Sequence, residues 1–184
     1  ERLKIQYGTS FCYPVSSMGA HVSAVPNHQV NRVTPLYTRA NVAFFGAFGY
    51  ELDLGRLTEE ERSQVREQIA FMKEYREVLQ FGDFYRLLSP FEGNITAWMV
   101  VSPDRRTALA GWYRTLNEVN GPFRRMKLRG LDPALDYTVN GCSVHGGDEL
   151  MEVGLLTTDS AAGECQAGER PSCDFDSRVY VLQA

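Results

Sequence analysis

Two carboxylates, Glu51 and Asp53, stand two positions apart in the first third of this 184-residue chain. We expect a strand over residues 49–54, and the alternation of side chains along a strand would place both carboxylates on one face. Two carboxyl groups about 5–5.5 Å apart can act as nucleophile and acid/base in the retaining hydrolysis of a glycosidic bond. Carboxylates at strand ends also cap helices or pair with arginine. We expect Glu51 and Asp53 to have that structural role, paired with Arg39 or Arg32.

Polar side chains also follow an earlier expected strand, a short apolar run over residues 20–25. Asn27 and His28 come directly after it, at the carboxyl end of the expected strand. Their side chains could hydrogen-bond to a sugar hydroxyl or hold a neighbouring loop in place. We therefore predict Asn27 and His28 as substrate-binding residues, with a loop-fixing hydrogen bond as the alternative.

Three aromatic residues, Trp98, Trp112 and Tyr113, could form a platform on which a sugar ring stacks. Strand alternation places Trp98 on the face opposite Ala97 and Met99. We favour packing in the core or between domains for these rings. A non-catalytic carbohydrate-binding or structural β-sandwich module is the alternative function.

The sequence predicts neither a metal site nor a cofactor site. His21, His28 and His145 are scattered, and no set of cysteines and histidines has the spacing of zinc ligands. Cys165 and Cys173 bracket a loop and could form a disulfide in an oxidising compartment. We favour free thiols in a cytoplasmic protein. The cysteines are Cys12, Cys142, Cys165 and Cys173.

The composition is that of a globular protein, with 43% hydrophobic and 23% charged residues and a net charge of −4. Nucleic acid is not an expected partner, because no strong positive excess is available for a phosphate backbone. A membrane is not expected either, because no apolar run approaches the roughly 18 residues that span a bilayer. The first five residues have neither an initiating Met nor a helix cap. We therefore expect a cut within a longer polypeptide.

The order of elements over residues 1–82 predicts an α/β unit. We expect a helix that ends near Gly8, the strand over 20–25, a helix capped by Thr34, and the strand over 49–54. A longer helix follows, with Thr58 and Glu61 as its capping box and Gly82 at its end. Its expected buried face consists of Val65, Ile69, Met72, Tyr75 and Leu79.

After residue 82 the hydrophobic period changes from that of helices to that of strands. Short strands separated by turn residues at this spacing are typical of an antiparallel sandwich. A basic stretch over 124–129 is expected to form a solvated edge. The expected strands cover residues 84–88, 95–101, 107–113, 123–129, 137–144 and 177–182.

Several motifs resemble those of the glycoside hydrolase family 36 α-galactosidases (melibiases). The first group follows the strands and helices of the N-terminal half: MGAHVSAVPNHQ over 18–29, TPLYTR over 34–39 and FGYELD over 48–53. The second group is GDFYRL over 82–87, SPFE over 89–92, AWMVVS over 97–102, LRGLDP over 128–133 and GDELM over 147–151. The resemblance covers nearly the whole chain. The visible departure is the loop over 160–174, which looks like an insertion.

The resemblance implies a fold of α/β plus all-β type. Residues 1–82 would be the C-terminal part of a (β/α)8 catalytic barrel, a partial TIM barrel that holds its last two strand-helix units. Residues 83–184 would be an antiparallel C-terminal β-sandwich. Members of the family hydrolyse terminal α-D-galactosides such as melibiose and raffinose and are frequently tetramers.

The same resemblance implies that the chemistry lies outside this chain. In the family, the nucleophile and the acid/base are aspartates on earlier barrel strands, and this chain begins just after the second of them. No catalytic residue can be assigned within 1–184. We therefore expect a fragment of a retaining α-galactosidase that is inactive when isolated.

Overall fold

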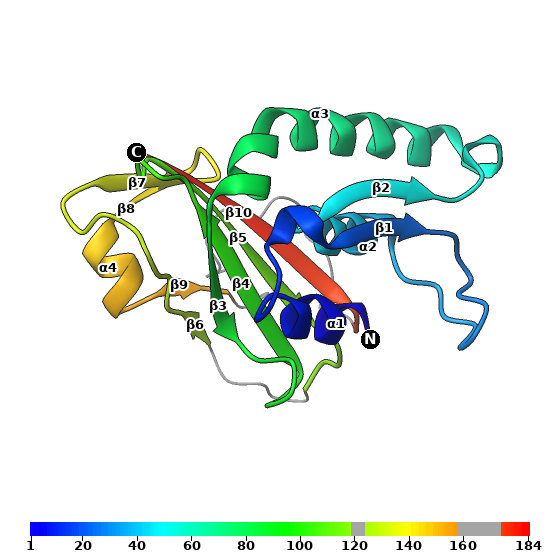
Figure 1. Ribbon diagram of the computed structural model, residues 1–184, viewed down its shortest axis with the longest axis horizontal. Coiled ribbons are helices and arrows are strands. Elements are labelled where there is room, and N and C mark those ends of the chain that lie inside the picture. The colour runs from blue at the N-terminus through cyan, green and yellow to red at the C-terminus, as the bar shows by residue number, and fades with distance from the viewer. Residues whose placement is uncertain (119–123, 158–173) are drawn as a thin grey trace. The chain divides into compact units, whose positions relative to one another are not determined.

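The computed structural model describes residues 1–118, 124–157 and 174–184, which belong to two compact units, Glu1–Phe81 and Gly82–Ala184 (Figure 1). Cys165, Cys173 and all but the last residue of the expected loop over 160–174 lie outside the described residues. Cys12 and Cys142 are exposed free thiols.

The first unit is a two-stranded parallel sheet with helices. β1 and β2 pair in register from Gly19 opposite Ala47 to Ser23 opposite Glu51. α2 connects them, as a crossover between parallel strands requires. The elements are α1 (Arg2–Thr9), η1 (Val15–Ser17), β1 (Gly19–Ser23), α2 (Leu36–Ala43), β2 (Ala47–Glu51), η2 (Leu54–Arg56) and α3 (Glu59–Phe81).

β2 lies two residues earlier at its start and three earlier at its end than the sequence predicted. Gly46 explains the early start, because a Cβ there would lie 2.5 Å from the Ala20 Cβ and 2.8 Å from the Met18 carbonyl. Only glycine permits this close approach of the chain to β1. The Ala47 N–H then donates to the Met18 carbonyl at 2.7 Å and begins the pairing. Asp53 consequently lies beyond the strand.

The prediction of Thr34 as the cap of α2 is wrong. The residue before the first turn is Pro35, and no side chain caps this end of the helix. The Thr34 carbonyl instead accepts a hydrogen bond from the Arg39 Nε at 3.0 Å.

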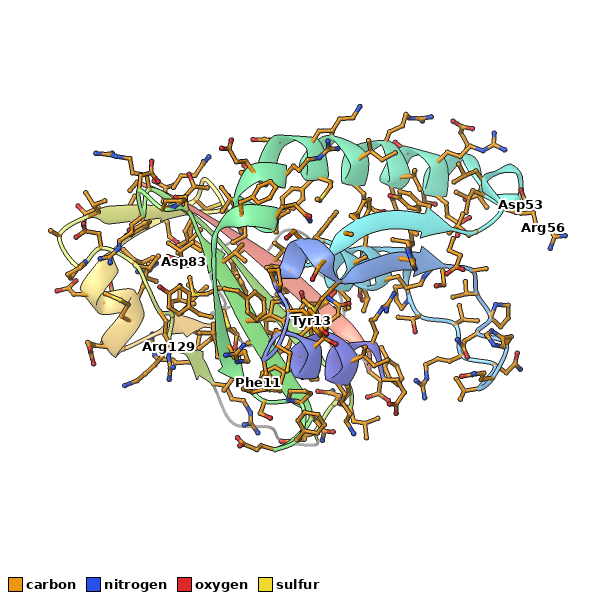
Figure 2. All side chains as sticks on the ribbon, viewed as in Figure 1. Phe11, Tyr13, Asp53, Arg56, Asp83 and Arg129 are labelled. Carbon is orange, nitrogen blue, oxygen red and sulfur yellow. The ribbon has the colours of Figure 1, made fainter. Side chains whose placement is uncertain are left out.

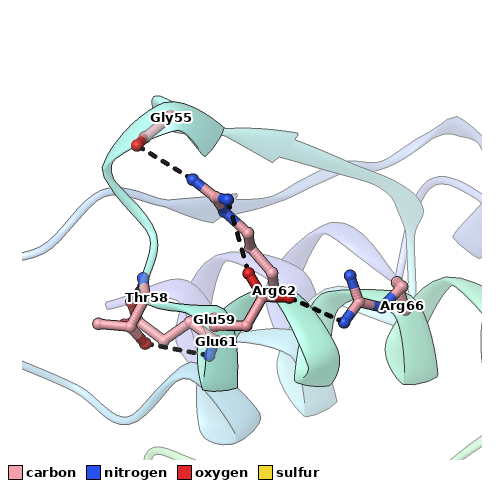
Figure 3. Close-up of polar contacts among 6 residues, drawn as sticks. All are labelled: Gly55, Thr58, Glu59, Glu61, Arg62 and Arg66. Atoms are coloured by element: carbon pink, nitrogen blue, oxygen red, sulfur yellow. Dashed lines mark hydrogen bonds and ion pairs between the residues drawn. The ribbon is translucent and has the colours of Figure 1, made fainter.

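The capping box of α3 is confirmed (Figure 3). The Glu61 N–H donates to the Thr58 Oγ1 at 3.2 Å, and the Thr58 N–H donates to the Glu61 Oε2 at 2.9 Å. Arg62 and Arg66 both pair with Glu59, at 3.6 and 3.3 Å. The two hydrogen bonds of the capping box satisfy amides that a helix start leaves without partners, whereas the ion pairs join side chains only.

The buried face of α3 is confirmed at Val65, Met72 and Leu79, but the prediction is wrong at Ile69, which is 37% exposed. Gln68 is buried in its place. It accepts a hydrogen bond from the Tyr50 hydroxyl at 2.8 Å, and burial raises the pKa of Tyr50 to about 12.

The second unit is built on an antiparallel six-stranded sheet with the order β3-β4-β5-β10-β7-β8, and β6 and β9 form a separate pair. One face of the large sheet packs with residues of β6, α4 and β9 around a shared hydrophobic core. The antiparallel sheet is confirmed, but the two layers are unequal. The elements are β3 (Asp83–Leu88), β4 (Ile95–Val101), β5 (Thr107–Arg114), β6 (Arg125–Met126), β7 (Asp136–Val139), β8 (Ser143–Gly146), α4 (Gly147–Glu152), β9 (Leu155–Leu156) and β10 (Asp176–Gln183).

The single strand predicted over 137–144 is wrong, because this stretch forms the β7–β8 hairpin. Asn140 and Gly141 have φ values of 50° and 70° and reverse the chain. Asn and Gly adopt positive φ readily in tight turns, and three residues, 140–142, separate the paired Val139 and Ser143. The strand predicted over 123–129 is reduced to Arg125–Met126, with residue 123 outside the described part.

Candidate functional site

The carboxyl ends of β1 and β2 lie next to each other, because the strands are parallel and Ser23 pairs with Glu51. The loops that leave this edge carry the residues predicted from the sequence. Along β1 the side chains alternate: Ala20 and Val22 are fully buried, whereas His21 and Ser23 are exposed. His21, Ser23 and Glu51 therefore share the face of the sheet that the helices leave uncovered.

Glu51 and Asp53 each contact a different partner. The Glu51 Oε2 lies 3.6 Å from the His21 Nδ1. The Asp53 Oδ1 accepts from the Gly55 N–H at 2.9 Å, and its Oδ2 lies 3.3 Å from the Arg56 Nε. Asp53 and Arg56 are located at the turn after β2, well past the strand end (Figure 2). Structural pairing of both carboxylates is therefore present, but with partners other than the predicted Arg39 or Arg32.

Arg39 ties the end of β1 to the start of α2. Its Nη1 donates to the Ser23 carbonyl at 2.5 Å and its Nε donates to the Thr34 carbonyl at 3.0 Å. Burial lowers the pKa of Arg39, and the nearby charge of Glu61 raises it. Arg39 thus positions the backbone of the loop edge and does not neutralise Glu51.

Asn27 closes the loop that follows β1. Its Oδ1 accepts from the N–H groups of Gln29 and Val30 at 3.0 and 3.2 Å. The Asn27 N–H donates to the Arg32 carbonyl at 2.9 Å. The loop-fixing role considered from the sequence is present at Asn27, and His28 is exposed on the same loop. Contact of Asn27 and His28 with a substrate stays a prediction.

His21 is the residue at this edge that sequence reasoning missed. The prediction considered the carboxylates near β2 and the two residues Asn27 and His28 after β1, whereas His21 lies within β1. The signal was available, because His21 and Ser23 are two positions apart and must share a face. The site thus offers one carboxylate and one imidazole, which can bind a polar ligand but do not provide the two carboxyl groups of a retaining hydrolase. Among the described residues, no three His, Cys, Asp or Glu side chains are grouped to hold a metal.

The aromatic residues of the second unit do not form a platform. Trp98, Trp112 and Tyr113 are at most 2% exposed. The rings of Trp98 and Tyr113 lie 4.8 Å apart, and burial raises the pKa of Tyr113 well above its usual value. The packing interpretation is confirmed, and a sugar platform at these residues is wrong. No helix in the described ranges is long and apolar enough to cross a bilayer.

Two family models match the chain. The Melibiase model matches residues 1–82, and the glycosyl hydrolase family 36 C-terminal domain matches residues 95–182. The Melibiase match ends just before β3, and the C-terminal domain match begins after it.

Relatives named as α-galactosidases match over the full chain. α-Galactosidase AgaA of Geobacillus stearothermophilus is 59% identical over 183 residues, which is 100% of this chain and 24% of that protein. α-Galactosidase Mel36A of Lactobacillus acidophilus is 45% identical over 185 residues, again 100% of this chain and 24% of the relative. The chain therefore spans about a quarter of the length of these relatives.

The solved structures agree with the sequence matches. A crystal structure of an AgaA variant in complex with raffinose has a TM-score of 0.90 and 52% identity, and the match covers 99% of this chain and 24% of that one. The α-galactosidase from Lactobacillus brevis has a TM-score of 0.88 and 45% identity over 99% of this chain. On the strength of both family models and these full-chain matches, the chain belongs to glycoside hydrolase family 36.

Proposed function

We propose that this chain is the C-terminal part of a retaining α-galactosidase that hydrolyses terminal α-D-galactosides of the melibiose and raffinose type. Residues 1–82 are the last two strand-helix units of a (β/α)8 barrel, and residues 83–184 are the C-terminal β-sandwich. The chain supplies part of the wall of the active site but neither the nucleophile nor the acid/base.

The observation that carries this proposal is the full-chain identity of 59% to an α-galactosidase. The geometry of the first unit supports it, because β1, α2, β2 and α3 alternate and the two strands are parallel. The same alternation builds barrels of this class, in which the carboxyl ends of the strands face the substrate.

The carboxylates at this edge support the second half of the proposal. Glu51 faces His21, and Asp53 is held by Gly55 and Arg56. Separate partners support the proposal that these two carboxylates do not act together as a retaining pair. Asn27 fixes the loop after β1, and we propose that this loop presents Asn27 and His28 to the galactoside.

A chimera tests the proposal, with this chain replacing the aligned segment of α-galactosidase AgaA. The chimera should hydrolyse an aryl α-galactoside. Within it, Glu51→Gln and Asp53→Asn should each keep kcat within about tenfold of the unsubstituted chimera, since neither carboxylate attacks or protonates the substrate. Loss of kcat by several orders of magnitude in either variant, with the fold retained, would place a catalytic carboxylate in this chain. An inactive but folded chimera would refute the α-galactosidase assignment itself.

A further inference from the structure

Three side chains of the second unit, Ser143, His145 and Glu149, form a row of hydrogen bonds. The Ser143 Oγ lies 3.1 Å from the His145 Nε2. The other ring nitrogen, Nδ1, lies 3.2 Å from the Glu149 Oε2. A hydroxyl, an imidazole and a carboxylate in this order are the groups that activate a serine as a nucleophile.

The local fold brings these three groups together. Ser143 and His145 are two positions apart on β8, so their side chains share one face of that strand. α4 follows β8 without a loop, since β8 ends at Gly146 and α4 begins at Gly147 (Figure 1). Glu149 lies in the first turn of α4, four positions after His145, and reaches back to its ring.

The hydrogen-bond partners assign the two ring nitrogens of His145. An ionised carboxylate only accepts hydrogen bonds, so the Nδ1 carries the proton and donates to Glu149. The Nε2 then has a lone pair that accepts from the Ser143 hydroxyl. The His145 side chain is 17% exposed and Ser143 is partly exposed. The imidazole is thus held in place, while a small molecule can approach the serine.

Negative charge lies beside this row and limits what it can bind. A Cβ at Gly146, the residue after His145, would lie 2.6 Å from the Asp148 Oδ1 and 3.9 Å from the Asp136 Oδ1. Both carboxylates are therefore close to the row, and together with Glu149 they would repel an anionic substrate. A neutral molecule with an electrophilic carbonyl carbon fits these charges.

We propose that Ser143, His145 and Glu149 form a second hydrolytic site, which cleaves small neutral carboxylic esters. The Ser143 Oγ attacks the ester carbonyl carbon while its proton passes to the His145 Nε2. The bond from that carbon to the alcohol oxygen breaks, and His145 returns the proton to the leaving alcohol. Water then attacks the acyl group with His145 as its base, the bond to the Ser143 Oγ breaks, and the acid leaves. Glu149 is a positioning residue that also stabilises the charged imidazole.

Hydrolysis of 4-nitrophenyl acetate by the AgaA chimera tests this site, because 4-nitrophenolate leaves readily. Ser143→Ala and His145→Gln should each lower kcat/KM for this ester by at least about tenfold, since each removes a reacting group. Glu149→Gln should lower it as well, because an amide can donate to the Nδ1 and so favours the tautomer whose Nε2 carries the proton. Ser17→Ala is the control, since the Ser17 hydroxyl donates to the Pro14 carbonyl at 2.8 Å.

A phosphorylating reagent identifies the nucleophile. Diisopropyl fluorophosphate should form an Oγ–P bond at Ser143 with loss of fluoride, which mass spectrometry of the labelled peptide locates. Cys142→Ser tests the neighbouring exposed thiol and should keep both the label and the ester hydrolysis. An unchanged midpoint of thermal unfolding shows that each variant keeps its fold.

Three results would overturn the proposal. One is a label on another residue of the unsubstituted chimera. Another is the same kcat/KM for the ester in Ser143→Ala as in Ser17→Ala. The third is loss of ester hydrolysis in Cys142→Ser, which would assign the reaction to the thiol. None of these measurements depends on the α-galactosidase reaction, so the proposed function stands or fails separately.

Discussion

Gln6 shows how one polar side chain fixes the first unit. It is 3% exposed, and its Nε2 donates to the carbonyls of Val42 and Phe45 at 3.1 and 2.9 Å. These carbonyls lie at the end of α2, where a helix leaves acceptors without internal partners. The side chain thus joins α1 to a part of the chain more than 30 positions away.

Gln6→Ala should lower the free energy of unfolding by about 1–3 kcal/mol, because buried carbonyls would lose their donor. Urea denaturation of the variant measures this loss, with Gln29→Ala as the control, since Gln29 is exposed. Equal midpoints for the two variants would show that the Gln6 contacts contribute nothing.

For single residues, the sequence predicted the structural role of a side chain better than the residue that it contacts. Structural pairing of Glu51 and Asp53 was foreseen, but the partners are His21 and Arg56, because Asp53 lies past the end of β2. Nothing in the local pattern singles out Gln6, whose neighbour Ile5 is 55% exposed. Contacts between distant segments leave no period in a sequence, so such residues are found only from coordinates.

At the scale of elements, the start of α3 depends on a local motif. Thr58 and Glu61 exchange hydrogen bonds, and Arg62 and Arg66 add ion pairs with Glu59. Thr58 and Glu61 are only three positions apart, which is why the sequence alone was sufficient to predict the capping box. The ion pairs of Glu59 were not predicted.

Thr58→Ala should destabilise the chain by about 1 kcal/mol, because the Glu61 N–H loses its acceptor. Thr58→Ser keeps the hydroxyl and should stay close to the parent. Circular dichroism during thermal unfolding measures both. If Thr58→Ala unfolds at the same temperature as Thr58→Ser, the capping box carries no stability.

Elements were mispredicted where tertiary contact or turn chemistry outweighs the apolar pattern. The run over 137–144 is apolar enough for one strand, but Asn140 and Gly141 turn the chain within it. β2 begins early because the backbone at Gly46 packs closely against Met18 and Ala20. This contact is visible only once β1 and β2 are paired, so the sequence pattern does not show it. Ile69 is 37% exposed because the buried face of α3 passes through its neighbour Gln68 instead.

At the scale of the whole molecule, the family was evident from motifs spread along the chain, and the family models and relatives confirm it. Those motifs sit on the strands, helices and turns of both units. The missing piece is chemical: Glu51 lies against His21 and Asp53 against Arg56, so each of the two candidate carboxylates has a partner of its own. We therefore expect the chain to complete an α-galactosidase without carrying out its reaction.

The isolated chain provides the most direct test. Purified and folded, it should release no phenol from an aryl α-galactoside above the buffer rate, while the AgaA chimera that contains it turns the substrate over. Turnover by the isolated chain, abolished by Glu51→Gln or Asp53→Asn, would contradict the claim that both catalytic acids lie outside these 184 residues.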